Sequence, residues 1–160
     1  MSSHILLDEI RSPDDALEMA ACRNQVRTFM THNQAEILPE QQLEWFRYTY
    51  TPARSKREML GYVARIGGRE PIGYGLISQR NWLMWVSGGI IGAERGKGYG
   101  RQLFDGLTQQ VHDLGISEVY LDVLEDNEPA RTLYESLGYV ALNNRDGLVL
   151  MVHRQLEEAA

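Results

Sequence analysis

Glycines alternate with basic residues in a short stretch near the middle of the chain. Seven consecutive positions hold three glycines and three cations: Arg95, Gly96, Lys97, Gly98, Tyr99, Gly100 and Arg101. Because glycine has no Cβ, the backbone N–H groups of such a loop can point into a common cavity. A helical apolar pattern starts directly after it, so the unpaired amides and positive dipole end of that helix add to the cations. The combination predicts a site for a pyrophosphate group.

The stretch departs from two well-known nucleotide-binding signatures. A P-loop carries Ser or Thr after its lysine to hold magnesium, whereas Lys97 is followed by Gly98. The dinucleotide fingerprint requires a glycine where Arg101 stands, and no ribose-binding unit follows at the expected distance. A plain surface turn is the bland alternative. Glycines alternating with cations at a helix start disfavour it.

A second motif follows the glycine loop. It reads Asn127-x-x-Ala130-x-x-Leu133-Tyr134-x-x-x-Gly138-Tyr139. Together with Arg95-x-x-Gly98-x-Gly100, this segment resembles the two signature motifs of the GNAT N-acetyltransferases. Either motif alone is moderately specific, but the pair in this order and at this separation is a strong signal. The resemblance is clear from about Tyr74 to Val140, and it implies the GNAT fold with acetyl-CoA as cosubstrate.

The resemblance also implies a set of cofactor-binding residues. In the family, strand amides just before the loop bond the pantetheine and polarise the acetyl carbonyl. Glycine inside a strand pattern independently indicates a bulge or a close ligand, although a simple hairpin bend would also explain it. Asn127 suits a helix N-cap, and the family also uses this asparagine near the cofactor. The expected residues are Gly88, Gly89, Ile90, Arg95, Gly96, Lys97, Gly98, Tyr99, Gly100, Arg101, Asn127 and Arg131.

Acetyl transfer to an amine requires a neutral amine, a polarised thioester carbonyl and a proton for the leaving thiolate. The resemblance implies that Tyr134 donates this proton; otherwise it packs on the apolar stripe of its helix. Asp122 is the candidate general base, at a strand position where some relatives carry a glutamate. A chain of waters, or a purely structural Asp122, is the alternative. Cys22 could act as a nucleophile, but a lone helical cysteine is more often a core residue, and the resemblance implies direct transfer in a ternary complex.

The first half of the chain reads as helices followed by antiparallel strands. Ser12 and Pro13 are typical of a helix start, and Pro52 predicts a loop after the second helix. Trp82 and Trp85 are expected in the core or in a pocket wall. The expected elements are a strand at 4–10, helices at 12–30 and 39–50, a loop at 51–58, and strands at 59–66, 71–78 and 81–91.

The second half alternates strands with helices. Leu103, Leu107 and Val111 recur at helical spacing after the glycine loop. A strand at 119–124, a helix at 127–137 and strands at 139–142 and 148–152 follow, which implies a parallel crossover. We therefore expect an α/β protein with a single-domain GNAT fold: a mixed, mostly antiparallel sheet of about six or seven strands flanked by helices. The resemblance implies a parallel pair splayed to admit the cofactor. The domain is expected at 1–155, before a short acidic tail at 156–160.

Length and composition limit the classes of function. The chain has 160 residues, a formal net charge of −6 and one cysteine. This length suits one domain, and the acidic balance argues against nucleic acid as a partner. No apolar run approaches the ~20 residues of a membrane span, so we expect no membrane partner and a cytoplasmic protein. The four histidines lack metal-ligand spacing, and we expect no metal.

The acceptor amine is the least constrained part of the hypothesis. In the family, the segment with both early helices shapes the acceptor site; here it carries Arg23, Arg27, Trp45, Phe46 and Tyr48. The segment resembles GNAT members that acetylate amino groups on nucleotide-linked sugars. Stacking faces and an anion-binding arginine would fit; helix core and surface pairs are the alternative. We expect a small polar amine as acceptor. A CoA-binding regulatory module, another acyl-CoA, a protein N-terminus and a homodimer remain open.

Overall fold

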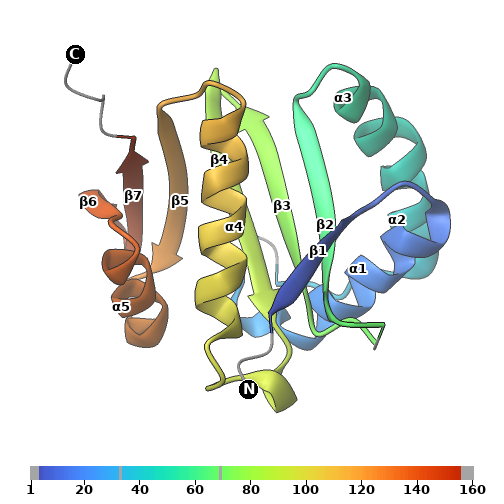
Figure 1. The fold of residues 1–160 in the computed structure, drawn as a ribbon, viewed down its shortest axis with the longest axis horizontal. Coiled ribbons are helices and arrows are strands. Elements are labelled where there is room, and N and C mark those ends of the chain that lie inside the picture. Colours follow the sequence, from blue (N-terminus) through green and yellow to red (C-terminus); the bar gives the residue numbers. More distant parts are fainter. Residues whose placement is uncertain (1–3, 33, 69, 156–160) are drawn as a thin grey trace.

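A seven-stranded mixed sheet runs through the computed structural model, in the order β1-β2-β3-β4-β5-β7-β6 (Figure 1). The strands are β1 (Ile5–Glu9), β2 (Met59–Ile66), β3 (Gly73–Arg80), β4 (Leu83–Ile90), β5 (Glu118–Leu124), β6 (Val140–Arg145) and β7 (Leu148–Arg154). The structure describes residues 4–32, 34–68 and 70–155, so the expected acidic tail at 156–160 lies outside the described residues. The strand count confirms the expected six or seven.

Helices cover both faces of the sheet. They are α1 (Pro13–Gln25), η1 (Arg27–Phe29), α2 (Pro39–Glu44), η2 (Trp45–Tyr50), α3 (Thr51–Ser55), η3 (Gly92–Glu94), α4 (Tyr99–Asp113) and α5 (Glu128–Ser136). Successive strand residues face opposite sides: Tyr62 belongs to an apolar cluster that includes residues of α4 and α5, whereas Val63 belongs to a cluster that includes residues of α1 and η2. These two clusters hold the layers together, and a smaller third cluster consists of Ala64, Ile66 and Ile72.

The first helix starts as expected but ends early. Ser12 accepts a hydrogen bond from the Asp15 amide at 3.2 Å and donates its own amide to the Asp15 carboxylate at 3.2 Å, which is a capping box. The helix ends at Gln25 rather than near Met30. Val26 leaves the helical conformation, and its buried side chain packs against Gly89 of β4. This contact turns the chain toward the sheet edge.

The loop expected over 51–58 is wrong in its first part, because the helical chain continues through Pro52. Residues Trp45–Tyr50 form a π-helical segment, and the Thr51 amide bonds the Phe46 carbonyl five residues back. The wider turn places Pro52 in the first turn of α3, where its missing N–H removes no intrahelical bond. Proline here follows a change of helix type rather than ending the helix.

The parallel pair of the sheet is splayed. β4 and β5 pair only at Met84 with Val119 and at Trp85 with Tyr120. β3 follows β4 on its other side up to Ile90, and β7 follows β5 over the whole strand. The edge of β4 from Val86 onward therefore has no partner in β5. This opening confirms the expected splay and is where the site is built.

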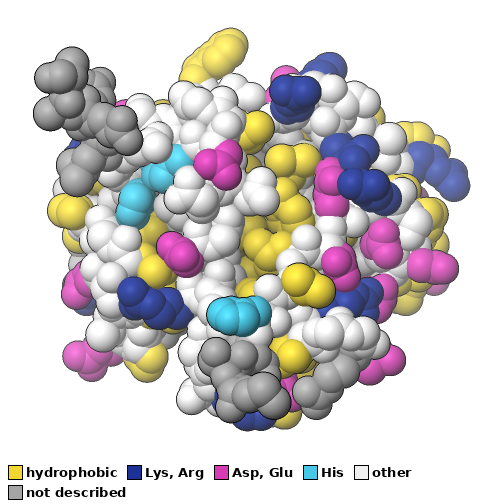
Figure 2. Space-filling view, in the orientation of Figure 1, with side chains coloured by type: hydrophobic (Ala, Val, Ile, Leu, Met, Phe, Trp, Pro, Cys, Tyr) yellow, Lys and Arg dark blue, Asp and Glu magenta, His cyan; other side chains and the backbone are white. Residues whose placement is uncertain are grey.

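The surface carries mixed charge. Figure 2 shows cations and acids interspersed over helices α1 to α3 on the face viewed. Trp82 does not lie in the core or a pocket wall as expected: it is 92% exposed. Asn81 and Trp82 both have positive φ at the β3–β4 turn, the conformation that a two-residue hairpin demands. Trp85 lies under the Arg80 guanidinium, 4.4 Å from the ring centroid. None of the described helices is long and apolar enough to cross a membrane.

Candidate active site

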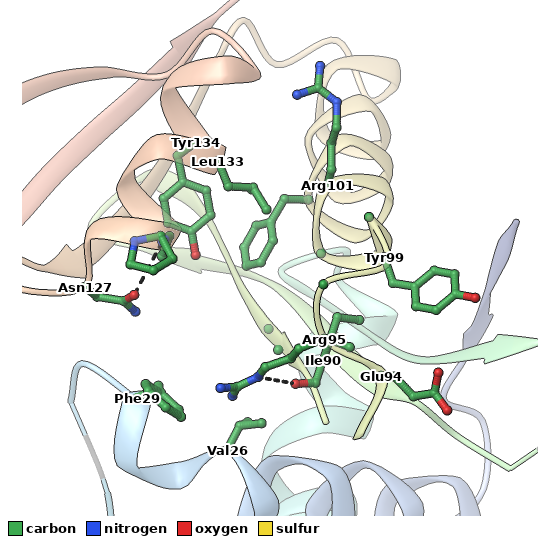
Figure 3. A pocket seen from close by; sticks show the side chains of 18 of the residues that line it. Val26, Phe29, Ile90, Glu94, Arg95, Tyr99, Arg101, Asn127, Leu133 and Tyr134 are labelled. Atoms are coloured by element: carbon green, nitrogen blue, oxygen red, sulfur yellow. Dashed lines mark hydrogen bonds between the residues drawn. The ribbon is translucent and has the colours of Figure 1, made fainter. Parts of the chain in front are cut away.

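A cavity of about 420 Å³ opens where β4 and β5 diverge (Figure 3). Its walls come from the end of β4, the glycine loop, the starts of α4 and α5, and η1. Ten of the twelve expected cofactor residues line it: Gly88, Gly89, Ile90, Arg95, Gly96, Gly98, Tyr99, Gly100, Arg101 and Asn127. Segments that lie far apart in the sequence thus line the same cavity.

Two expected cofactor residues are not among those lining this cavity. The Lys97 ammonium pairs with the Glu94 carboxylate at 3.0 Å. The Arg131 guanidinium donates Nη1 to the Glu125 carbonyl at a long 3.4 Å, and its buried Nε has no hydrogen-bond partner among the described residues. Their proposed cofactor contacts stay predictions.

The β4 edge presents backbone groups to the cavity. The Ile91 amide donates to the Ile72 carbonyl at 2.8 Å, and bonding to β3 alternates along an antiparallel pair. Gly88 and Ile90 therefore turn their N–H and C=O groups away from β3, toward the opening. The Arg95 Nε donates to the Ile90 carbonyl at 3.3 Å, as this orientation requires. A Cβ on Gly88 would lie 2.4 Å from the Tyr74 carbonyl oxygen, so no side chain fits there.

The glycine loop forms an electropositive helix start. Gly98 is the N-cap of α4 with φ 82°, a left-handed conformation that glycine adopts without strain. No side chain caps the helix and no acid occupies its first turn. The first amides of α4 thus remain available, and the helix dipole is uncompensated by an acid. Arg101 donates to the Ser136 hydroxyl at 2.6 Å, which ties α4 to α5 beside these amides.

Tyr134 lies where α5 meets the cavity. Its ring is buried and contacts Phe104 edge-on, with centroids 4.9 Å apart. Figure 3 shows its hydroxyl pointing into the cavity. The hydroxyl has no hydrogen-bond partner among the described residues. Burial, and then the proximity of other tyrosines and Asp122, raise the pKa of Tyr134 far above its usual value, so the phenol stays protonated at neutral pH.

A second cavity, of about 300 Å³, adjoins the first and also has Tyr134 and Gly88 in its wall. Asp122 of β5 lines it, and both carboxylate oxygens are engaged. The Thr31 hydroxyl donates to Oδ1 at 2.9 Å, and the His32 Nε2 lies 2.7 Å from Oδ2. Sequence reasoning missed His32 altogether, because this contact joins residues 90 positions apart.

A third cavity, of about 460 Å³, continues beyond His32 and is bordered by α1 and α2. Of the residues expected to bind the acceptor, Arg23 and Trp45 line it. Trp45 also stacks on Tyr50 with ring centroids 5.1 Å apart, and Phe46 stacks on Tyr50 with centroids 5.8 Å apart. Tyr48 is 70% exposed and lines none of the three cavities. The expected aromatic platform is thus reduced to one ring.

Cys22 is buried in the cluster under α1 and lines none of these cavities. Burial raises its pKa to about 11, so it is a neutral thiol at physiological pH and a poor nucleophile. Within the described part of the chain, no group of three or more His, Cys, Asp or Glu residues is placed to hold a metal ion.

The fold and the site define an α/β protein with a cavity between splayed strands and a cationic glycine loop in its wall. The model of the acetyltransferase (GNAT) family matches residues 20–139. The chain belongs to this family.

Known proteins resemble the chain at different levels. YycN of Bacillus subtilis, an uncharacterised N-acetyltransferase, is 39% identical over 51 residues, a match that spans 32% of this chain and only 33% of that relative. The structure of yncA from Salmonella typhimurium, solved with its cofactor acetyl-CoA, has a TM-score of 0.77 at 19% identity, covering 100% and 98% of the two chains. Ribosomal-protein-S5-alanine acetyltransferase from Vibrio fischeri has a TM-score of 0.75 at 15% identity, covering 94% and 93%. At these identities the structural likeness confirms the fold.

Proposed function

We propose that the protein transfers an acetyl group from acetyl-CoA to a primary amine, by direct attack in a ternary complex. The observation that carries this proposal is the order of the cavities. The first contains the cationic glycine loop and the hydroxyl of Tyr134, and the second continues from Tyr134 to Asp122. Donor and acceptor can therefore meet beside one proton-donating hydroxyl.

The residues present fit acetyl-CoA. The free amides at the start of α4, with Arg95 and Arg101 beside them, would hold the pyrophosphate. The one acid in the wall near this loop, Glu94, is paired with Lys97 and so repels a phosphate less. The amides of Gly88 and Ile90 would bond the pantetheine and polarise the acetyl carbonyl. When bound, acetyl-CoA supplies an activated thioester.

Tyr134 supports the chemistry at the leaving group. The amine nitrogen attacks the carbonyl carbon, the carbon–sulfur bond breaks, and the sulfur takes the proton of the Tyr134 hydroxyl. The attacking nitrogen then carries one excess proton, which it loses to solvent to give the neutral amide, and solvent returns a proton to the phenolate. Asp122 lies on the acceptor side of Tyr134, in the wall of the second cavity, where an ammonium group must lose a proton before it can attack.

A small polar amine is the acceptor that the third cavity favours. Its volume falls within the usual range for small-molecule sites. Polar side chains, among them Arg23, Glu36 and Gln41, share this wall with apolar residues and with the aromatic residues Trp45 and Tyr74. The polar groups can bind the hydroxyl or carboxylate groups of an amino sugar or an amino acid, and the rings can pack on its carbon atoms.

Thiol release from acetyl-CoA tests the proposal against amino sugars, amino acids, polyamines and N-terminal peptides side by side. We expect release with one or more small amines. Binding of acetyl-CoA without release from any acceptor would favour a CoA-binding regulatory module. Turnover of peptides alone would refute the small-molecule acceptor. A higher kcat/KM with succinyl-CoA than with acetyl-CoA would refute the acetyl group as the one transferred.

A further inference from the structure

His32 and Asp122 are in contact in the wall of the second cavity. The Asp122 side chain is only 14% exposed and the His32 side chain 55%. The carboxylate receives two hydrogen bonds from adjacent residues of one loop, from Thr31 at Oδ1 and from His32 at Oδ2. The pair therefore joins the segment after η1 to strand β5, across the second cavity.

The partner atoms fix the tautomer of the imidazole. An ionised carboxylate only accepts hydrogen bonds, so the His32 Nε2 facing Asp122 must carry the hydrogen. In the neutral ring, Nδ1 then holds a lone pair and can accept a proton. An aspartate that orients a histidine in this way also stabilises the imidazolium that forms when the ring takes up that proton.

The position of His32 relative to the three cavities indicates which proton this lone pair could accept. His32 lines both the second and the third cavity, whereas Tyr134 lines both the first and the second. His32 therefore lies where the second and third cavities adjoin, beside an acceptor that reaches from the third cavity toward the thioester. Tyr134 lies where the second cavity adjoins the first.

We propose that His32 is the general base of the transfer and that Asp122 is its positioning residue. The proposal rests on the proposed acetyltransferase function. The ammonium group of the acceptor gives its first proton to the His32 Nδ1, and the freed nitrogen lone pair forms the new C–N bond. As the carbon–sulfur bond breaks, the nitrogen loses its second proton to solvent and the thiolate takes its proton from Tyr134. The imidazolium passes its proton to solvent after the product leaves. Asp122 orients the ring and is itself held at both carboxylate oxygens, by Thr31 and by His32.

Charged groups of both signs surround the imidazole. Both signs face the two cavities that His32 lines, so the cations there offset the acids. The titratable and charged groups in these walls are Asp122 from β5, Arg80 from β3, Tyr134 and Tyr74 from α5 and β3, Arg23 from α1, and Glu36 from the segment before α2.

Two variants distinguish a general base at His32 from a purely structural contact between the loop and Asp122. His32→Gln keeps an N–H donor for Asp122 but has no proton acceptor, whereas Thr31→Val removes the other bond to the same carboxylate. With glucosamine at pH 7, His32→Gln should lower kcat about 10²–10⁴-fold and should abolish the acidic limb of the kcat/KM profile. Thr31→Val loosens Asp122 but leaves the imidazole in place, so it should keep that limb whatever its effect on kcat. Equal, small losses in both variants would refute the base.

Methoxyamine provides a second kinetic test, because its amino group is neutral at pH 7 and needs no base to free its lone pair before attack. The loss caused by His32→Gln should be much smaller with methoxyamine than with glucosamine. An equal loss with both amines would show that His32 does not act on the acceptor proton.

Nitrogen-resolved NMR of the imidazole is independent of any acceptor. At pH 8 the His32 Nε2 should carry the hydrogen and Nδ1 should carry none. Asp122→Asn should change the proportion of the two tautomers. A hydrogen on Nδ1 while the wild type turns over amines would refute the base alone. Failure of the wild type to bind acetyl-CoA, or to acetylate any amine of the panel, would instead refute the proposed function, and the base with it.

Discussion

Tyr134→Phe removes one hydroxyl from the wall of the cavity and leaves the ring in place. The ring is held by its edge-on contact with Phe104, with centroids 4.9 Å apart, and phenylalanine preserves this contact. The hydroxyl bonds none of the described residues, so its loss breaks no internal hydrogen bond. If Tyr134 donates the proton to the thiolate, only chemistry should suffer.

The expected magnitudes separate catalysis from stability. Loss of a general acid should lower kcat about 10²–10⁴-fold while the Kd of acetyl-CoA changes little. The free energy of unfolding should change by less than about 0.5 kcal/mol, because the hydroxyl points into the cavity and its loss breaks no internal hydrogen bond. Burst-phase kinetics and urea unfolding measure the two quantities.

Tyr139→Phe is the matched control. Tyr139 is also buried, with its ring 6.1 Å from that of Tyr134, but its hydroxyl shares a 2.6 Å hydrogen bond with Thr108. Removing that bond should cost about 1 kcal/mol of stability and leave kcat nearly unchanged. The two variants should therefore show opposite patterns. A loss of kcat below about threefold in Tyr134→Phe, with chemistry shown to be the slow step, would make Tyr134 a packing residue.

Three further changes test the donor side, the acceptor side and the fold. Gly98→Val should lower the affinity for acetyl-CoA at least about tenfold in calorimetry, because a β-branched residue is strained at φ 82°; Gly92→Ala, which meets no atom within 4 Å, should not. Trp45→Ala should raise the acceptor KM with the acetyl-CoA Kd unchanged, whereas Phe46→Ala, outside the acceptor cavity, should lose only stability; equal KM values would contradict this. Burial and a neighbouring histidine lower the pKa of His153 below 6.5, so the unfolded chain binds more protons and stability should fall as pH drops through about 6.5. Urea midpoints at pH 7.5 and 5.5 should differ less in His153→Gln.

The donor side of the site could be predicted from the sequence because its chemistry is local. A pyrophosphate is bound largely by backbone amides, and Gly98 and Gly100 signal those amides within a few residues of each other. Asn127 caps α5 by accepting from the Ala130 amide at 3.4 Å, again within one turn. Such features depend on neighbouring positions, so a short pattern is enough to indicate them.

Tertiary contacts overrode local rules elsewhere. Val26 leaves the first helix because β4 offers it a place beside Gly89. Pro52 does not end its helix, because the π-helical turn before it changes the bonding register. In each case the local preference exists, but a tertiary contact outweighs it, and no short sequence pattern indicates that contact. Trp82 is different: Asn81 before it is itself a turn signal, and the two-residue turn then exposes the tryptophan.

The acceptor side shows why half of the site was hidden from sequence reasoning. In the sequence, the four histidines are not separated by the short spacings that metal ligands use, so no pattern marks His32 as functional. His32 instead meets a carboxylate on the far strand of the splayed pair, at 2.7 Å. That meeting depends on the early end of α1, since the chain must turn at Val26 before residues 30–32 can reach β5. A single unpredicted helix end thus determines whether Asp122 faces solvent or a histidine. The same turn at Val26 should therefore matter for acceptor chemistry, although Val26 itself lines only the donor cavity.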